Sequence, residues 1–222
     1  MGDRTQEFCT VYNMVRLADY LFRFTGDAAY LDYIEKNLYN GFLAQQNKFT
    51  GMPTYFLPIK AGSKKKWGSK THDFWCCHGT TVQAHTIYPL LCWYEDSSKN
   101  RLVVAQYLNA VYKRSENVTV TQRVDMKYYN DGASFDEHDD SRMSRWFIRI
   151  NVKADTPEAF TLSLRIPSWV VGTPDISVND EAVKNISSLD GCFDIERTWE
   201  DDTITIYFKT ALTTCLLYTS DA

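Results

Sequence analysis

A chain of 222 residues, 44% hydrophobic and 14% aromatic, holds enough apolar surface for a sizeable core, which excludes wholesale disorder. Its 24 basic and 28 acidic residues give a net charge of −4, so there is no broad basic surface for a nucleic acid partner. No apolar run approaches the ~18 residues of a membrane span, and we expect no membrane partner.

The first hundred residues predict helices. Apolar residues recur every three or four positions over residues 11–24, which is the pattern of an amphipathic helix. Gly26 suits the end of that helix and Asp27 the start of a second one, which we expect to run to about residue 46. Two helices joined by so short a turn form an antiparallel hairpin, the unit of helical bundles and barrels. We expect a third helix over residues 80–94.

Residues 51–68 lie between the second and third expected helices and predict a loop, because they contain two prolines and begin and end with glycine. This loop carries the run Lys64-Lys65-Lys66. Runs of one charge are most often solvated, so we interpret these lysines as part of a solvated loop rather than a binding site.

From about residue 100 the pattern changes to short strands that are rich in β-branched and aromatic residues. Several of them alternate between apolar and polar side chains. Six such strands separated by polar loops predict an antiparallel β-sandwich, and the fold class is therefore α+β. The expected strands are residues 102–107, 118–124, 146–152, 160–166, 176–178 and 203–208.

Six cysteines are spread along the chain: Cys9, Cys76, Cys77, Cys92, Cys192 and Cys215. Their spacing matches no small secreted framework, and a bond between the adjacent Cys76 and Cys77 would be strained. We therefore favour thiol or metal roles in a reducing compartment, and expect a cytoplasmic location. We interpret Cys92 and Cys192 as packing residues.

Glu7, Cys9, Cys76 and Cys77 are candidates for one site. Glu7 and Cys9 are two positions apart, so their side chains point the same way in an extended backbone. Cys76 and Cys77 precede the third expected helix, where N-terminal amides lower the pKa of a thiol. One carboxylate and three thiolates would fill a tetrahedral zinc sphere. Spacing alone leaves a second interpretation open, in which these cysteines are buried and inert.

Two further interpretations come from other classes of protein. His78 is either the base of a metal-free Cys-His hydrolase with Cys76 as nucleophile, or a helix-entry histidine bonded to backbone. The abundant aromatic residues and the expected sandwich also suit a non-catalytic carbohydrate-binding protein. A lectin needs no cysteine triad, however, and this argues against the carbohydrate-binding interpretation.

An ordered set of motifs occupies residues 5–95. They are Glu7-x-Cys9, Tyr12-Asn-Met14, Leu21-Phe-Arg-Phe-Thr-Gly-Asp27, Tyr33-Ile-Glu-Lys-Asn-Leu-Tyr-Asn-Gly41, Gly51-Met-Pro-Thr-Tyr-Phe-Leu-Pro58 and Phe74-Trp-Cys-Cys-His-Gly79. Together the motifs resemble the β-L-arabinofuranosidase family of glycoside hydrolases, family 127 and its relatives. The strand-rich part is similar to the β-sandwich that follows in that family.

The resemblance implies a partial (α/α)6 helical barrel followed by an antiparallel β-sandwich. It also implies a retaining exo-glycosidase that hydrolyses β-L-arabinofuranosides or related plant-derived carbohydrates, without the usual carboxylate pair. Carried over by position, it implies Zn2+ as cofactor, with Cys76 as nucleophile and Glu35 and Tyr55 as contacts of the arabinose ring. The implied zinc ligands are Glu7, Cys9, Cys76 and Cys77.

The chain departs from the family pattern at both ends. The general acid of the family is a glutamate upstream of Glu7-x-Cys9, so we expect it before residue 1 and expect this chain, as a fragment of a longer bacterial enzyme, to be inactive alone. Residues 215–222 resemble a translated sequencing adapter, and we expect a non-native tail there. The expected domains are residues 1–97 from the barrel and residues 98–214 from the sandwich.

Overall fold

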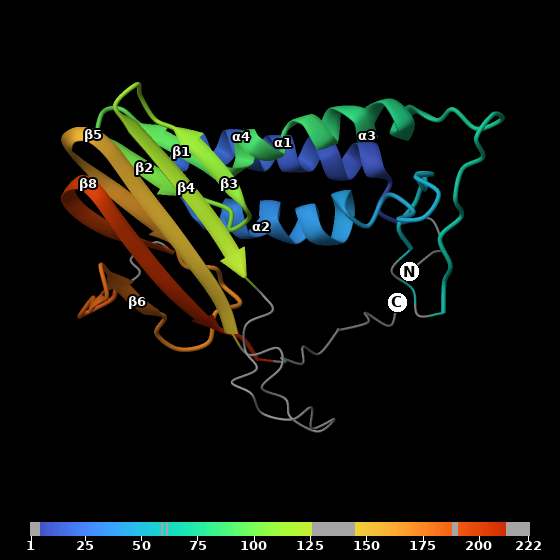
Figure 1. Ribbon diagram of the computed structural model, residues 1–222. Coiled ribbons are helices and arrows are strands. Elements are labelled where there is room, and N and C mark those ends of the chain that lie inside the picture. Colours follow the sequence, from blue (N-terminus) through green and yellow to red (C-terminus); the bar gives the residue numbers. More distant parts are fainter. Residues whose placement is uncertain (1–4, 59, 61, 126–144, 188–190, 212–222) are drawn as a thin grey trace. The chain divides into compact units, whose positions relative to one another are not determined.

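The computed structural model describes residues 5–58, 60, 62–125, 145–187 and 191–211. The expected tail at residues 215–222, including Cys215, lies outside the described residues. Helices occupy the first part of the chain and strands the rest, as Figure 1 shows, so the predicted α+β class is confirmed. No helix in the described part of the chain is long and apolar enough to cross a bilayer.

The chain divides into two compact units. The first comprises Met1–Gln106, Phe160–Arg165 and Ser188–Arg197, and the second comprises Tyr107–Ala159, Ile166–Ser187 and Thr198–Ala222. All helices of the described residues lie in the first unit. The strands β5 (Arg145–Arg165) and β8 (Cys192–Lys209) contribute residues to both units.

Helix α1 (Phe8–Thr25) is the predicted amphipathic helix, although it begins at Phe8 rather than at residue 11. Glu7 caps its start, because the Glu7 carboxylate accepts a hydrogen bond from the Thr10 N–H. Gly26 ends the helix in the left-handed conformation, with φ of 73°. The buried stripe consists of Phe8, Val11, Tyr12, Val15, Ala18 and Phe22.

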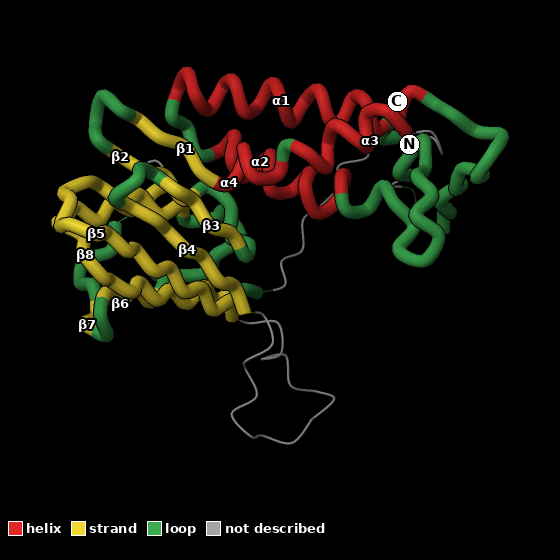
Figure 2. Tube along the Cα trace, turned by 45° about the horizontal axis from the view of Figure 1, so that its top comes forward, coloured by secondary structure: helices red, strands yellow, loops and turns green. Residues whose placement is uncertain are grey.

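Helix α2 (Ala29–Asn37) continues directly into a π-helical turn, η1 (Leu38–Phe42), and together they form the predicted second helix as far as residue 42. Figure 2 shows α2 alongside α1, against which it packs. The π turn brings Gly41 close to α1, where a Cβ atom would lie 2.7 Å from Val11 Cγ1. Glycine therefore permits this close approach of the two helices.

The prediction of one helix over residues 80–94 was wrong at both ends. Helix α3 (Cys76–Thr86) begins at Cys76, and a separate short helix, α4 (Tyr88–Cys92), follows it. Pro89 explains the interruption, since it lacks the N–H donor that would continue the hydrogen bonding of α3. Residues 93 and 94 already belong to the first strand, β1 (Trp93–Asp96).

The strands form one hydrogen-bonded network in the order β1-β2-β5-β8-β6-β7, with β4 paired to β5 and β3 paired to β4. The strands not yet given are β2 (Arg101–Val104), β3 (Ala110–Lys113), β4 (Val118–Asp125), β6 (Asp175–Val178) and β7 (Glu181–Ala182). The short strands β1, β3 and β7 were not predicted from the sequence.

The sheet is mixed, whereas the sequence predicted antiparallel pairing throughout. β4 pairs with β5 in antiparallel fashion, but β2 pairs with β5 in parallel, with Leu102 opposite Leu162 and Val104 opposite Leu164. Parallel strands need a long connection, and here 56 residues lie between Val104, the last paired residue of β2, and Thr161, the first paired residue of β5. An alternating strand pattern carries no information about that direction.

The expected strands 146–152 and 160–166 are parts of the single strand β5. Pro157 lies between them and normally marks the end of a strand. Asn117 compensates, because its side chain accepts a hydrogen bond from the Thr156 N–H at 2.8 Å and donates one to the Thr156 carbonyl at 2.9 Å. With these backbone groups satisfied, the strand continues past the proline.

Candidate functional site

Glu7 and Cys9 flank Phe8 at the start of α1, and Phe8 anchors both of them. The Phe8 ring is fully buried and packs edge-on against Phe42, with ring centroids 5.4 Å apart. The Phe8 N–H donates a hydrogen bond to the Tyr55 carbonyl at 3.4 Å. The start of α1 is therefore held against the loop that contains Tyr55.

The two carboxylate oxygens of Glu7 have different partners. Oε2 accepts hydrogen bonds from the Thr10 N–H at 2.8 Å and from the Thr10 hydroxyl at 2.9 Å. Oε1 lies 3.1 Å from Cys77 Sγ and 3.9 Å from Cys76 Sγ. One oxygen thus caps α1, and the other faces the cysteine pair.

Cys76 and Cys77 are the first two residues of α3, which places both thiols at the start of a helix. Cys77 is fully buried, whereas Cys76 is exposed. Cys9 Sγ lies 3.7 Å from Cys77 Sγ and 3.0 Å from the Thr80 hydroxyl oxygen. Thr80 lies about one helical turn after Cys76 and Cys77, so its side chain is on the same face of α3 as theirs.

The ligand atoms of Glu7, Cys9, Cys76 and Cys77 all lie within 4.8 Å of one another. The prediction that these four side chains converge is therefore confirmed. All five cysteines of the described residues are free of disulfide bonds. Cys92 and Cys192 are both buried, which confirms their interpretation as packing residues.

The pKa of Cys76 shifts in the opposite direction from those of Cys9 and Cys77. Burial acts to raise the pKa of Glu7, but hydrogen bonds from Cys77 and Thr10 outweigh it and lower that pKa to about 2. Burial raises the pKa of the Cys77 thiol and of the Cys9 thiol. The pKa of Cys76 is lowered, first by hydrogen bonding from Cys9 and then from Tyr55. Cys76 is thus the thiol that loses its proton most readily.

The chemistry and spacing of this cluster fit a zinc ion. Thiolates and a carboxylate are common zinc ligands, and bond lengths of ~2.0–2.3 Å around a tetrahedral ion place neighbouring ligand atoms ~3.3–3.8 Å apart. The Cys9–Cys77, Cys77–Glu7 and Cys76–Glu7 separations are 3.7, 3.1 and 3.9 Å. Small shifts of the side chains would bring all four atoms into one coordination sphere.

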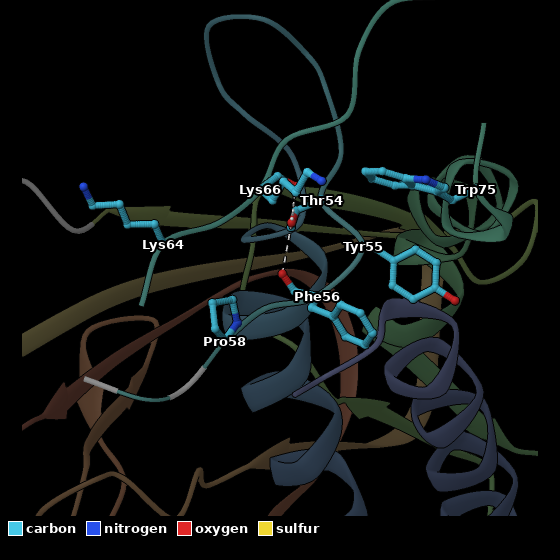
Figure 3. A pocket seen from close by; sticks show the side chains of 7 residues that line it. All are labelled: Thr54, Tyr55, Phe56, Pro58, Lys64, Lys66 and Trp75. Carbon is cyan, nitrogen blue, oxygen red and sulfur yellow. Dashed lines mark hydrogen bonds between the residues drawn. The ribbon is translucent and has the colours of Figure 1, made fainter. Parts of the chain in front are cut away.

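A pocket of about 510 Å³ lies beside this cluster. Its lining consists of Thr54, Tyr55, Phe56, Pro58, Lys64, Lys66 and Trp75, shown in Figure 3. Trp75 directly precedes Cys76, and the Tyr55 hydroxyl lies 3.8 Å from Cys76 Sγ. Hydrogen bonding with Cys76 raises the pKa of Tyr55 to about 12. Tyr55 therefore belongs both to the pocket wall and to the surroundings of the exposed thiol.

Glu35 occupies a different environment from Tyr55. Its carboxylate is buried on α2 and forms an ion pair with Arg165 at 2.8 Å. Arg165 is fully buried, contacts Asp32 at 2.6 Å and donates a hydrogen bond to the Ala105 carbonyl. The structure thus places Glu35 in an ion group around the buried Arg165, and none of the four candidate ligand residues belongs to that group.

His78 has the environment of a capping residue at the start of α3. Its Nδ1 accepts a hydrogen bond from the Trp75 N–H at 3.0 Å, and its ring stacks on Phe74 with centroids 5.4 Å apart. The histidine at this position takes the role that glutamate or glutamine has in a capping box. This favours the helix-entry interpretation of His78 over that of a base for Cys76.

Sequence reasoning missed Thr80 and Trp75 as components of the site. Thr80 contacts Cys9, and Trp75 lines the pocket with its ring 5.7 Å from the Tyr55 ring. A signal for both was present, since the two residues lie within four positions of Cys76. Starting the expected helix at residue 80 rather than at Cys76 hid that relationship.

Comparison with protein families gives two matches. Residues 2–90 match the β-L-arabinofuranosidase GH127 catalytic domain, and residues 101–210 match the GH127 middle domain. No curated protein matches the chain.

Solved structures of similar fold include a GH127 β-L-arabinofuranosidase from Geobacillus stearothermophilus T6, with 21% identity, a TM-score of 0.66, and coverage of 91% of this chain and 31% of that one. A second GH127 β-arabinofuranosidase has 22% identity and a TM-score of 0.69, with 91% and 32% covered. A third structure, a glycoside hydrolase, has 16% identity and a TM-score of 0.68, with 96% and 34% covered. The chain spans about a third of the length of these structures.

Proposed function

Because the chain belongs to the GH127 family of β-L-arabinofuranosidases, we propose that it carries the nucleophile and the metal ligands of a retaining exo-glycosidase. The proposed substrates are β-L-arabinofuranosides or related plant-derived glycosides. The observation that carries the proposal is the convergence of Glu7, Cys9, Cys76 and Cys77 beside a pocket, with Cys76 exposed.

We assign these four residues as ligands of one Zn2+ ion. When bound, zinc would favour the thiolate form of Cys76 at neutral pH, since coordination to a cation deprotonates a thiol. Glu7 supplies the oxygen that does not cap α1. Cys77 is buried and Cys9 is partly so, which leaves Cys76 as the ligand most accessible to a sugar.

In the proposed reaction the Cys76 thiolate attacks the anomeric carbon of the sugar. The new C–S bond forms as the glycosidic C–O bond breaks, and the leaving oxygen departs with the bonding pair and takes up a proton from a general acid, for which we assign no residue of this chain. Water then attacks the same carbon as the C–S bond breaks, its proton passes to the conjugate base of that general acid, and Cys76 leaves as thiolate. Two displacements at one carbon retain its configuration.

Tyr55 is the residue that we propose to contact the sugar, because its hydroxyl adjoins Cys76 Sγ and its side chain lines the pocket. The corresponding role for Glu35 stays a prediction, since its carboxylate is paired with Arg165. We further propose that residues 1–97 belong to an (α/α)6 barrel and residues 98–214 to a β-sandwich domain.

The alternatives have weaker support. A metal-free Cys-His hydrolase requires His78 to accept the Cys76 proton, but His78 Nδ1 already accepts the Trp75 N–H. A carbohydrate-binding protein without catalysis would account for the pocket but not for the four converging ligand atoms. We therefore propose the zinc-thiolate glycosidase.

Metal analysis of the purified chain tests the ligand assignment. We expect one zinc ion per chain by mass spectrometry, much weaker zinc binding in C9A and C77A, and wild-type binding in C92A, the control for loss of a cysteine outside the cluster. Incubation with an aryl β-L-arabinofuranoside should label Cys76 and no other cysteine. A chain without zinc, or a C77A variant that binds zinc normally, would refute the assignment.

A further inference from the structure

The lysine run at residues 64–66 is divided between two faces of its loop. Lys64 and Lys66 line the pocket beside Cys76. The Lys65 ammonium instead donates a hydrogen bond to the Ala44 carbonyl at 2.7 Å and lies over the Trp67 ring, 5.4 Å from its centroid. Successive side chains of an extended segment point to opposite sides, which accounts for this division.

Backbone pairing holds the lysine segment beside the pocket. The Thr54 hydroxyl donates to the Lys66 carbonyl at 2.9 Å, and Thr54 forms an isolated β-bridge with Trp67. The Gly68 N–H donates to the Pro53 carbonyl at 2.9 Å. Since Tyr55 follows Thr54 directly, one short stretch of chain holds Tyr55 beside Cys76 and Thr54 beside Lys66.

The pocket therefore joins an aromatic end to a cationic end. Figure 3 shows Tyr55 and Trp75 at one end, Lys64 at the other, and Lys66 between them beside Thr54. No acidic side chain is among the described residues that line it. The Asp73 carboxylate interacts electrostatically with Lys66 and accepts a hydrogen bond from the Ser69 N–H at 2.7 Å, but it does not line the pocket. The two lysines thus give the described lining of the pocket a net positive charge.

We propose that this pocket accepts a glycoside whose leaving-group sugar is a uronic acid, with its carboxylate attracted by the positive charges of Lys64 and Lys66. The inference rests on the proposed function, because the sugar under attack must lie at Cys76 and the next sugar then extends along the pocket. Tyr55, Phe56 and Trp75 provide the aromatic surface on which a sugar ring packs. The Thr54 hydroxyl holds the Lys66 carbonyl, so the backbone segment that carries the two lysines is positioned before the ligand binds.

Binding of a matched pair of disaccharides tests the inference. The probes are the S-linked disaccharide of β-L-arabinofuranose and galacturonic acid, which resists turnover, and its methyl ester. We expect the acid to bind about three- to tenfold more tightly than the ester at low salt, since exposed ion pairs each contribute modestly. The preference should decline as ionic strength rises.

The K64Q/K66Q variant should lose the preference for the acid and bind the ester as the wild type does. The control K65Q/K70Q removes the same number of charges from residues that do not line the pocket, and it should keep the preference. Equal binding of acid and ester by the wild type, or equal preference in the two variants, would overturn the inference.

The neutral ester separates this inference from the proposed function. If the ester binds but the acid has no advantage, the uronic acid assignment fails and the glycosidase proposal stands. If neither disaccharide binds, both fail. A disaccharide with a 6-sulfate in place of the carboxylate is the third probe, and tighter binding of the sulfate than of the uronate would overturn the choice of a carboxylate.

Discussion

The Glu7 carboxylate lies 3.1 Å from Cys77 Sγ although 70 residues separate the two in sequence. The same carboxylate caps α1 through the Thr10 N–H. Glu7 therefore links the start of α1 to the start of α3, and it has a structural role as a cap and a proposed role as a metal ligand. The two roles can be separated by the choice of substitution.

Glu7→Gln should weaken zinc binding strongly while lowering the free energy of unfolding of the metal-free chain less than Glu7→Ala does. The glutamine oxygen still accepts the Thr10 N–H, but the neutral amide is a poor zinc ligand. Glu7→Ala should lose the cap as well, at ~1 kcal/mol. Urea unfolding with a chelator present and competitive zinc titration measure the two effects. Equal destabilisation by both variants without metal would contradict the separation of roles.

Arg165→Met should reduce the free energy of unfolding by ~3–5 kcal/mol, because it removes the buried cation that pairs with the buried Glu35 carboxylate and the partly buried Asp32 carboxylate. Arg165 is fully buried and contacts both Asp32 and Glu35. Urea unfolding measures the loss. Glu35→Gln provides the second test, since a role in the ion group predicts lower stability, whereas a sugar contact predicts weaker sugar binding at unchanged stability.

Alanine at Gly41 and at Gly79 should have opposite effects. At Gly41 a Cβ would lie 2.7 Å from Val11 Cγ1, and we expect a loss of ~1–3 kcal/mol. At Gly79, inside α3, no atom lies within 4 Å of the new Cβ, and we expect a gain of ~0.5–1 kcal/mol. Thermal and urea unfolding measure both. V11A/G41A should lose less than the sum of its single changes, and additivity would argue against the proposed contact.

Tyr94 should make the chain sensitive to alkali. Its pKa is raised by burial and by the hydrogen bond that its hydroxyl donates to Asp19 at 2.7 Å. Because the folded pKa exceeds the unfolded value of ~10, this stabilisation is complete below pH ~10 and is lost as the pH rises further. Tyr94→Phe should cost ~1 kcal/mol at pH 7 and flatten the decline above pH 10. Urea unfolding against pH measures this, with the exposed Tyr20→Phe as control; an unchanged slope in Tyr94→Phe would contradict it.

Local sequence was sufficient for the helical hairpin and for the identity of the four side chains that converge. The periodic apolar residues of α1 and the Gly26–Asp27 junction depend only on neighbours in the chain. The motifs around Glu7 and Cys76 indicated which side chains to bring together, and the structure confirmed that they meet. The capping role of His78 and the helix break at Pro89 are also local signals, and together they mark the start and the end of α3 better than the predicted range of residues 80–94 does.

Only the tertiary structure decided features that depend on partners distant in sequence. The parallel pairing of β2 with β5 joins Leu102 to Leu162, and no alternation pattern within either strand specifies that direction. The division of the lysine run likewise follows from the pairing of its segment with Thr54, which turns Lys64 and Lys66 toward the pocket. The sequence by itself determined which chemical groups the protein has and which local elements hold them. Contacts between segments far apart in the chain decided which way these groups point, because the pairing of a backbone segment sets the orientation of its side chains.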